Sequence, residues 1–169
     1  MPVRVIDGNL FDSKAKYICH QVNCQGKMGS GVARTVREKF PKVFEEYKKM
    51  CDSSTDRSEL LGCVQLVRCR AWENEVFICN LFSQDRYGYD GKRYTNYDAF
   101  VNCMRGLQQR VPKGETIAMP YQIGCSLGGG SWDVIYGIIK GWLGDDYNVE
   151  LWRLNKDVKR PKGGKRPYR

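Results

Sequence analysis

The segment YICHQVNCQGKMGSGVARTVREKF, residues 17–40, indicates which kind of fold to expect. Its first part, residues 17–23, is largely apolar and has the length of a buried strand. Three glycines between residues 26 and 31 then end the strand. Apolar residues at every fourth position from 32 to 40 predict a helix with one buried stripe. A strand, a glycine-rich turn and a helix in this order are typical of α/β domains.

Apolar runs of strand length recur along the chain and alternate with periodic helical patterns. The expected strands are Val3–Ile6, Tyr17–Asn23, Leu61–Cys69, Glu75–Ser83, Thr116–Met119 and Val149–Leu154. The expected helices are one that carries Val32, Val36 and Phe40, its continuation at Lys42–Cys51 after Pro41, one capped near Thr95 that carries Tyr97, Val101, Met104 and Leu107, and one capped by Ser131 that carries Ile135, Ile138, Ile139 and Trp142. This alternation implies an α/β fold with a mixed, mostly parallel sheet that is covered on both faces. Ligands of such sheets bind beyond the carboxyl ends of the strands.

Length and composition fit one globular domain. The chain has 169 residues, of which 41% are hydrophobic and 28% charged. The longest apolar runs, such as Val76–Cys79 and Val134–Ile139, are far shorter than the roughly 20 residues of a membrane helix. Residues 1–10 lack the apolar core of a signal peptide. We therefore expect a soluble protein without membrane contact, cytoplasmic or otherwise intracellular, and the nucleus stays open.

Most of the net positive charge lies at the carboxyl end of the chain. The formal net charge is +9, and residues 156–169 hold seven basic side chains against one acidic, so they supply +6 and the rest of the chain +3. This end has two prolines, a glycine pair and no apolar periodicity. We expect a folded domain over residues 1–155 and a disordered basic tail over residues 156–169. The tail either makes weak, salt-dependent contacts to nucleic acid or merely keeps the protein soluble.

The eight cysteines do not have the spacing of a disulfide framework or a zinc site. No CxxC pair occurs, and Cys19, Cys63, Cys69 and Cys79 lie within apolar runs, so reduced, buried thiols are expected. The single histidine, His20, adjoins Cys19, and no second ligand pair follows at the spacing of a zinc finger. The sequence therefore predicts no metal and no cofactor.

Two glycine-rich loops each follow an expected strand and precede an expected helix. They are GKMGSGV at residues 26–32 and GCSLGGGSW at residues 124–132. Glycines let the backbone approach a ligand closely, and the following helix adds the positive end of its dipole, so both loops suit phosphate oxygens. Two such loops suggest a pyrophosphate. Neither ends in the GK[ST] of a P-loop, and the first is no GxGxxG, which argues against ATP hydrolysis and against ordinary dinucleotide redox chemistry.

Two polar residues stand beside the first loop, at the end of the expected strand. Asn23 could hydrogen-bond sugar hydroxyls. His20, with an ordinary pKa near neutrality, could give or take a proton in hydrolysis. The alternative for a lone histidine is a structural role in the core. Strand alternation places His20 on the face opposite to that of Asn23, although the two faces merge where the strand ends.

Several motifs together resemble the macrodomain family of ADP-ribose-binding modules. They are GNLF (8–11), CHQVNCQGKMGSGVA (19–33), LLGCVQLV (60–67), CNLFSQ (79–84), MPYQIGCSLGGGSW (119–132) and VELWRL (149–154). The resemblance covers nearly all of residues 1–155. It is closest to the small stand-alone branch, which includes ADP-ribose 1″-phosphate phosphatases and hydrolases that remove terminal ADP-ribose from glutamate. It implies a three-layer α/β/α macrodomain fold with ADP-ribose lying across the top of the sheet.

The resemblance also assigns binding roles by position. Asn9 stands where macrodomains usually have an adenine-binding Asp, and its amide oxygen can still accept a hydrogen bond. Asn23 matches the family's Asn at the distal ribose. Trp152 or Leu154 would border the adenine, although a plain core role for Trp152 is the alternative. The residues expected around the ligand are Asn9, Leu10, Asn23, Gly29, Ser30, Gly31, Val32, Gly124, Cys125, Ser126, Leu127, Gly128 and Trp152.

The resemblance also separates two chemistries. Glutamate-ADP-ribose hydrolases use a Lys after the CNLFS-type strand and an Asp in the second loop, and here these positions are Gln84 and Gly128. Phosphatase-like members have a His ahead of an N-C-x-G segment, and His20 followed by NCQG reproduces that order. We therefore expect a monomeric ADP-ribose 1″-phosphate phosphatase with His20 as the catalytic residue. The alternatives are a non-catalytic reader of ADP-ribose or of ADP-ribosylated protein, and a hydrolase of acyl- or protein-linked ADP-ribose; Cys24 or Cys125 as nucleophile is a weaker idea.

Overall fold

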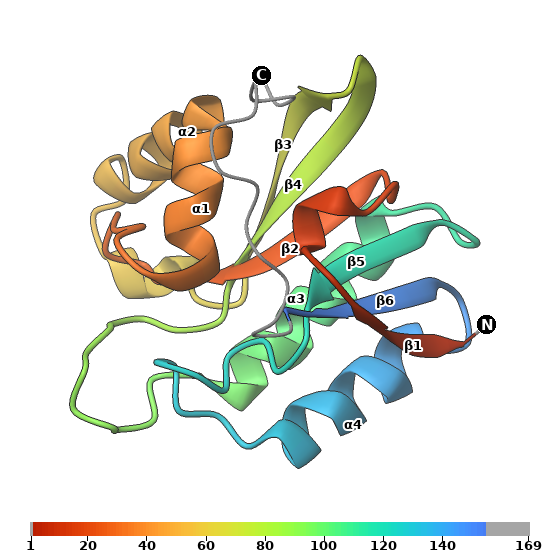
Figure 1. The fold of residues 1–169 in the computed structure, drawn as a ribbon. Coiled ribbons are helices and arrows are strands. Elements are labelled where there is room, and N and C mark those ends of the chain that lie inside the picture. The colour runs from red at the N-terminus through yellow and green to blue at the C-terminus, as the bar shows by residue number, and fades with distance from the viewer. Residues whose placement is uncertain (1, 155–169) are drawn as a thin grey trace.

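The chain folds around one mixed β-sheet (Figure 1). The computed structural model describes residues 2–154. The strands lie in the order β1-β6-β5-β2-β4-β3, and each neighbouring pair is parallel except β3 and β4. Their bounds are Val3–Asp7 (β1), Tyr17–Val22 (β2), Val64–Ala71 (β3), Asn74–Phe82 (β4), Thr116–Pro120 (β5) and Asn148–Arg153 (β6). The prediction of a mixed, mostly parallel sheet is confirmed.

Helices cover both faces of this sheet, as Figure 1 shows. One pair, α1 and α2, packs on one face, and the other pair, α3 and α4, packs on the opposite face. The bounds are Gly31–Lys39 (α1), Pro41–Asp52 (α2), Tyr97–Arg110 (α3) and Trp132–Leu143 (α4), with short 3-10 turns at Leu10–Asp12 (η1) and Arg57–Leu60 (η2). The expected three-layer α/β/α arrangement is therefore confirmed.

Strand β2 takes part in two separate cores. Its side chains alternate, so Ile18 and Val22 pack toward α1 and α2, whereas Tyr17 and Cys19 pack toward α3 and α4. All four are buried. A strand that is buried on both faces cannot show polar alternation, and this explains why residues 17–19 are apolar in succession.

The local signals at the helix ends were mostly correct. Pro41 separates two helices as expected, since α1 ends at Lys39 and α2 begins at the proline, where a missing amide proton is no loss. Helix α3 is capped by Asn96, whose Oδ1 accepts from the amide of Ala99 at 2.9 Å. The cap expected near Thr95 is therefore one residue further on. The Thr95 hydroxyl donates instead to the carbonyl of Gly124.

One helix face was predicted wrongly in part. In α4 the fully buried residues are Ile135, Ile139 and Leu143. Trp142, which we expected on the buried face, is 37% exposed, and its ring lies 5.9 Å from the guanidinium carbon of Arg105. The stripe ends on Leu143 rather than on Trp142, so the large indole lies at the edge of the core.

All eight cysteines fall within the described residues and carry free thiols, as expected. Six are buried, and Cys63 and Cys125 are half-buried. In residues 2–154 no helix is long and apolar enough to cross a membrane. The expected tail, residues 156–169, lies outside the described part of the chain, so the division of the chain at residue 155 stays a prediction.

Candidate functional site

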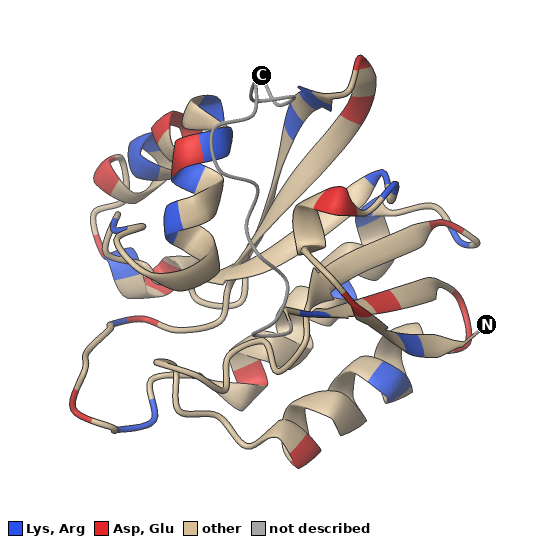
Figure 2. Cartoon of the chain, viewed as in Figure 1, with Lys and Arg blue, Asp and Glu red and all other residues tan. Residues whose placement is uncertain are grey.

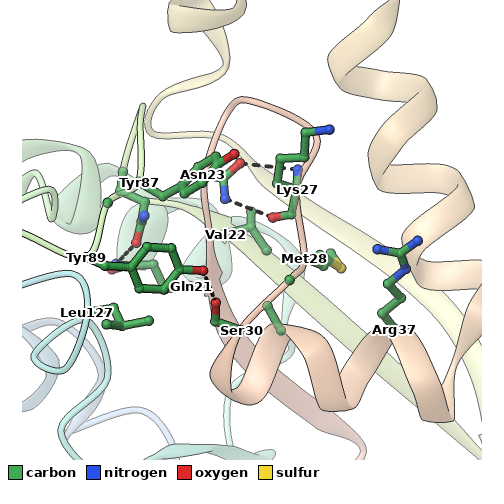
Figure 3. A pocket seen from close by; sticks show the side chains of 14 residues that line it. Gln21, Val22, Asn23, Lys27, Met28, Ser30, Arg37, Tyr87, Tyr89 and Leu127 are labelled. Atoms are coloured by element: carbon green, nitrogen blue, oxygen red, sulfur yellow. Dashed lines mark hydrogen bonds between the residues drawn. The ribbon is translucent and has the colours of Figure 1, made fainter.

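A cavity of about 240 Å³ lies beyond the carboxyl ends of β2 and β4 (Figure 3). The end of β2, the first glycine loop, α1, the loop between β4 and α3, and the second glycine loop all contribute to it. The lining residues are Gln21, Val22, Asn23, Lys27, Met28, Gly29, Ser30, Ala33, Arg37, Gln84, Tyr87, Gly88, Tyr89 and Leu127. The position agrees with the rule for ligands of parallel sheets.

The cavity contains part of the predicted binding set. Asn23, Gly29, Ser30 and Leu127 line it. The other predicted positions lie outside its lining: Asn9, Leu10, Gly31, Val32, Gly124, Cys125, Ser126, Gly128 and Trp152. Its volume is below the roughly 300–1,000 Å³ of typical small-molecule pockets. It therefore suits one portion of an extended ligand rather than the whole of one.

Asn23 holds the first loop in shape. Its Oδ1 accepts from the amide of Gln25 at 2.9 Å, and the Tyr47 hydroxyl lies 2.8 Å from the same atom. Its Nδ2 donates to the carbonyl of Lys27 at 2.8 Å. Burial raises the pKa of the Tyr47 hydroxyl, so this group stays a hydrogen-bond donor. Because an amide nitrogen has two hydrogens, one donor of Asn23 remains for a ligand.

The amino-terminal end of α1 adjoins the cavity without a side-chain cap. Ser30 is the N-cap residue, but its hydroxyl makes no cap hydrogen bond and instead lies 2.5 Å from the hydroxyl of Tyr89 (Figure 3). The first amides of a helix have no partner within the helix and suit an anion. A Cβ built on Gly29 or Gly31 would meet no atom within 4 Å. The first loop therefore leaves space beside these amides.

The second glycine loop is packed quite differently. The carbonyl of Gly128 accepts from the amides of Tyr94 and Thr95 at 2.8 and 2.9 Å, and the Thr95 hydroxyl donates to the carbonyl of Gly124 at 2.7 Å. A Cβ on Gly128 would lie 2.5 Å from the Thr95 hydroxyl. Internal packing thus explains this glycine without a ligand, and the loop presents Leu127 to the cavity.

A polar network that the sequence analysis missed joins the strands at the floor of the cavity. The Nε2 of Gln21 lies 2.5 Å from Oε1 of Gln84 and 3.0 Å from the hydroxyl of Thr95, and its Oε1 accepts from the hydroxyl of Ser83 at 2.7 Å. Gln21 and Gln84 both line the cavity. Polar residues at the ends of two neighbouring strands were the available signal, and sequence reasoning assigned Gln84 no contact with Gln21.

His20, the predicted catalytic residue, is not part of the cavity lining. It is 1% exposed, and its Nε2 lies 2.5 Å from Oδ1 of Asn80. Asn80 in turn donates to Oε1 of Gln65 at 3.0 Å. Since Oδ1 is an acceptor, Nε2 carries the proton and Nδ1 holds a lone pair, and Nδ1 is buried without a partner. Burial lowers the pKa of His20 to about 4, against the opposing effect of the Asn80 bond.

The residues assigned to adenine meet at the opposite end of the sheet top. Asn9 caps η1, where its Oδ1 accepts from the amide of Phe11 at 3.0 Å. The Trp152 ring lies against Gly8, and its Nε1 lies 3.0 Å from a carboxylate oxygen of Glu150. Both side chains therefore have a structural partner already. Asn9 follows Gly8 in the chain and the Trp152 ring packs against Gly8, so the two residues lie near one another. Both lie outside the lining of the cavity.

The thiols near the loops are poor nucleophiles. Burial raises the pKa of Cys24 to about 12 and also raises the pKa of Cys125. A thiol reacts as the thiolate, so both groups stay protonated and unreactive near neutrality. Within residues 2–154 no group of three or more His, Cys, Asp or Glu side chains is placed to hold a metal ion.

Together these features define a class of protein. The cavity lining contains Lys27 and Arg37 and no carboxylate, and an uncapped helix start adjoins it. An α/β domain with such a site at the sheet top suits an anionic ligand.

The family follows from comparison with known proteins. The Macro domain family model matches residues 19–139, and the chain therefore belongs to the Macro domain family. An uncharacterized 17.5 kDa protein of Enterobacteria phage T4 is 32% identical over 157 residues, which is 89% of this chain and 93% of that protein. The ADP-ribose 1″-phosphate phosphatase of Saccharomyces cerevisiae is 26% identical over 165 residues, which is 92% of this chain and 84% of that protein.

A solved structure shows the same fold. Thermosipho africanus DarTG, solved in complex with ADP-ribose, superposes with a TM-score of 0.73 and 20% sequence identity. The match covers 95% of this chain and 43% of that one. The macrodomain fold expected from the sequence is thereby confirmed.

Proposed function

We propose that this protein binds ADP-ribose and hydrolyses ADP-ribose 1″-phosphate to ADP-ribose and phosphate. The observation that carries the proposal is the cavity beside the uncapped start of α1, with Lys27 and Arg37 in its lining and no carboxylate. Such a site favours a polyanion. The yeast relative named ADP-ribose 1″-phosphate phosphatase supports a macrodomain hydrolase, and its 26% identity leaves the particular substrate to be tested.

The proposed pose uses the geometry of the two loops. The diphosphate lies on the backbone of Gly29–Val32 and faces Gly124–Gly128, where amide groups replace the water around its oxygens. The distal ribose lies in the cavity, where the remaining amide hydrogen of Asn23 donates to a hydroxyl. The adenine lies toward Asn9, Leu10 and Trp152, outside the cavity. The small volume of the cavity, about 240 Å³, supports this division of the ligand.

In the proposed reaction, water attacks the phosphorus atom, the bond from phosphorus to the 1″-oxygen breaks, and the leaving oxygen takes a proton. His20 is the predicted base for the attacking water. With a pKa of about 4 it is neutral at pH 7, and its Nδ1 lone pair has no partner. Direct contact with the substrate requires a local opening, because His20 is 1% exposed.

His20→Ala tests this role. A general base contributes about 10²- to 10⁴-fold, so turnover should fall by that factor while ADP-ribose affinity stays unchanged. Turnover is measured as phosphate release and affinity by calorimetric titration. Unchanged turnover would exclude His20 as the base and leave it a core residue.

The substrate itself is tested by phosphorus NMR of ADP-ribose 1″-phosphate mixed with the purified protein in metal-free buffer. The proposal expects the pyrophosphate signals to shift and inorganic phosphate to accumulate. Shifted signals with an intact monoester would point to a reader or to a hydrolase of another ADP-ribose derivative. Unshifted signals would contradict ADP-ribose binding altogether.

One observation favours a second candidate, a non-catalytic reader of ADP-ribose or of ADP-ribosylated protein. The only histidine is buried outside the cavity lining, and Gln84 occupies the position where the resemblance places a catalytic lysine in glutamate hydrolases. A reader needs the binding surface and no proton transfer. It would bind ADP-ribose and ADP-ribose 1″-phosphate and release no phosphate from the latter.

A further inference from the structure

Exposed aromatic side chains gather at the mouth of the cavity. Tyr87 and Tyr89, from the loop between β4 and α3, are 45% and 70% exposed. Leu127 of the second glycine loop is 46% exposed and lies below them in the same view (Figure 3). Large apolar groups that remain in water around one opening mark an interaction surface more often than scattered ones do.

The loop that carries the two tyrosines is fixed at both ends. Gln84 and Thr95 form a β-bridge across its base, and the amide of Cys24 donates to the carbonyl of Asp85 at 2.9 Å. The hydroxyl of Tyr89 reaches the hydroxyl of Ser30 at the start of α1. The Tyr89 ring is thus held across the cavity mouth with most of its surface in water.

Basic side chains surround the same opening. Lys27 and Arg37 line the cavity, and Arg86 precedes Tyr87 on the loop. The carboxylates nearby have partners of their own. Asp85 accepts from the side chain of Gln25 at 3.0 Å, and Asp90 accepts from the Tyr94 hydroxyl at 2.9 Å.

The opening therefore has three cations, Lys27, Arg37 and Arg86, against the two carboxylates of Asp85 and Asp90. Lys27 and Arg86 form no salt bridge within residues 2–154, and the guanidinium of Arg37 lies 4.0 Å from the centre of the Phe44 ring. Figure 2 shows basic and acidic positions on the loop between β4 and α3, at the lower left of the view. We call Lys27, Arg37, Arg86, Tyr87 and Tyr89 the cavity rim.

We propose that the cavity rim binds single-stranded nucleic acid, with unpaired bases stacked on Tyr87 and Tyr89 and phosphates on Lys27, Arg37 and Arg86. Exposed aromatic faces beside cations are the combination that single strands recognise. An acidic peptide would use the cations alone and leave both rings in water. A duplex keeps its base faces stacked internally and cannot use the rings. This surface shares Lys27 and Arg37 with the proposed ADP-ribose site, and its binding of nucleic acid goes beyond the proposed phosphatase activity.

The test is fluorescence anisotropy of a labelled 12-nucleotide thymidine strand titrated with the full chain. Tyr87→Ala and Tyr89→Ala should each weaken binding by about tenfold, because stacking of a base on an aromatic ring has an effect of that order. Tyr89→Phe keeps the ring and loses only the contact to Ser30, so its affinity should stay within about threefold of the parent. Trp142→Ala is the matched control, because it removes an exposed aromatic on α4 and should change nothing.

A charge variant supplies an independent measure. Arg86→Glu, at an exposed loop position, should weaken binding of the thymidine strand. It should also lower the slope of log affinity against log salt. Circular dichroism melts show whether each variant folds. Equal affinity of the parent, Tyr87→Ala and Tyr89→Ala would overturn the proposal, as would no binding, equal affinity for a duplex, or tighter binding of a polyglutamate peptide. Phosphate release from ADP-ribose 1″-phosphate, measured separately, reports only on the proposed enzyme activity.

Discussion

At the scale of single residues, Asn23 combines a structural and a binding role. Its side chain is 8% exposed and bonds to backbone groups of Gln25 and Lys27. Asn23→Ala leaves these groups without a partner, so we predict a loss of about 1–3 kcal/mol in the free energy of unfolding and a weaker affinity for ADP-ribose. Urea denaturation and calorimetric titration measure the two effects. Tyr47→Phe is the control, because it removes the hydroxyl that lies 2.6 Å from the carbonyl and 2.8 Å from the Oδ1 of Asn23 and leaves the ligand-facing amide. Equal losses of affinity in both variants would assign Asn23 a purely structural role.

His20 makes stability depend on pH in a definite direction. Its pKa is lowered from 6.5 to about 4 in the folded protein. Between these values the unfolded chain binds a proton that the folded one excludes, so the free energy of unfolding falls as pH drops from about 6.5 to about 4. Above pH 6.5 the full stability is present. The shift corresponds to roughly 3 kcal/mol.

Urea denaturation at pH 7.5, 6 and 5 measures this dependence. His20→Gln has no group that titrates there, so its stability should vary less over the same range than that of the parent. Parallel curves for the two proteins would mean that His20 is accessible to protons in the folded state.

At the scale of elements, we expect alanine substitutions in the two glycine loops to have opposite effects on stability and on binding. A Cβ on Gly128 would lie 2.5 Å from the Thr95 hydroxyl and 2.7 Å from the carbonyl of Gly124, whereas a Cβ on Gly29 meets nothing within 4 Å. Gly128→Ala should therefore destabilise the fold by about 1–3 kcal/mol. Gly29→Ala should keep the stability and weaken ADP-ribose binding, because the methyl group occupies space beside the ligand. Thermal melts and calorimetric titration separate the two effects; a stable Gly128→Ala variant would show that the second loop can move.

The elements also show how far sequence reasoning reaches. The strands were predicted to within a few residues. Burial on both faces makes most of β4 and β5 an apolar run, whereas the edge strands β1 and β3 contain exposed charged residues between apolar ones. The Ser30 to Tyr89 contact and the Gln21 network could not be predicted, since they join segments about 60 residues apart whose side chains meet only after the sheet forms. The burial of His20 also depends on what packs above its strand. Sequence reasoning located the glycine loops and Asn23 and left open whether Tyr87 and Tyr89 lie beside a ligand.

At the scale of the whole molecule, the division of charge separates two modes of nucleic acid binding. Residues 156–169 hold seven of the 28 basic side chains, and their removal changes the net charge from +9 to +3. The weak contact predicted for this tail rests on phosphate charge alone, whereas the cavity rim adds stacking.

The oligomeric state, expected to be monomeric, is also a prediction at this scale, and light scattering should give the monomer mass of 19.5 kDa.

Truncation after Asn155 distinguishes the two modes. Each cation that contacts a single strand adds about 0.7 to the slope of log affinity against log salt, so loss of the seven tail cations can lower that slope by at most about 5. The truncated chain should lose this strongly salt-dependent part of the affinity for a thymidine strand and keep the part that Tyr87→Ala and Tyr89→Ala remove. Anisotropy titrations from 50 to 300 mM salt measure both. If truncation abolishes binding at every salt concentration, the tail alone holds nucleic acid and the tyrosines at the cavity mouth have another partner. If truncation leaves the slope unchanged, the tail makes no contact with the strand, and its charge serves solubility.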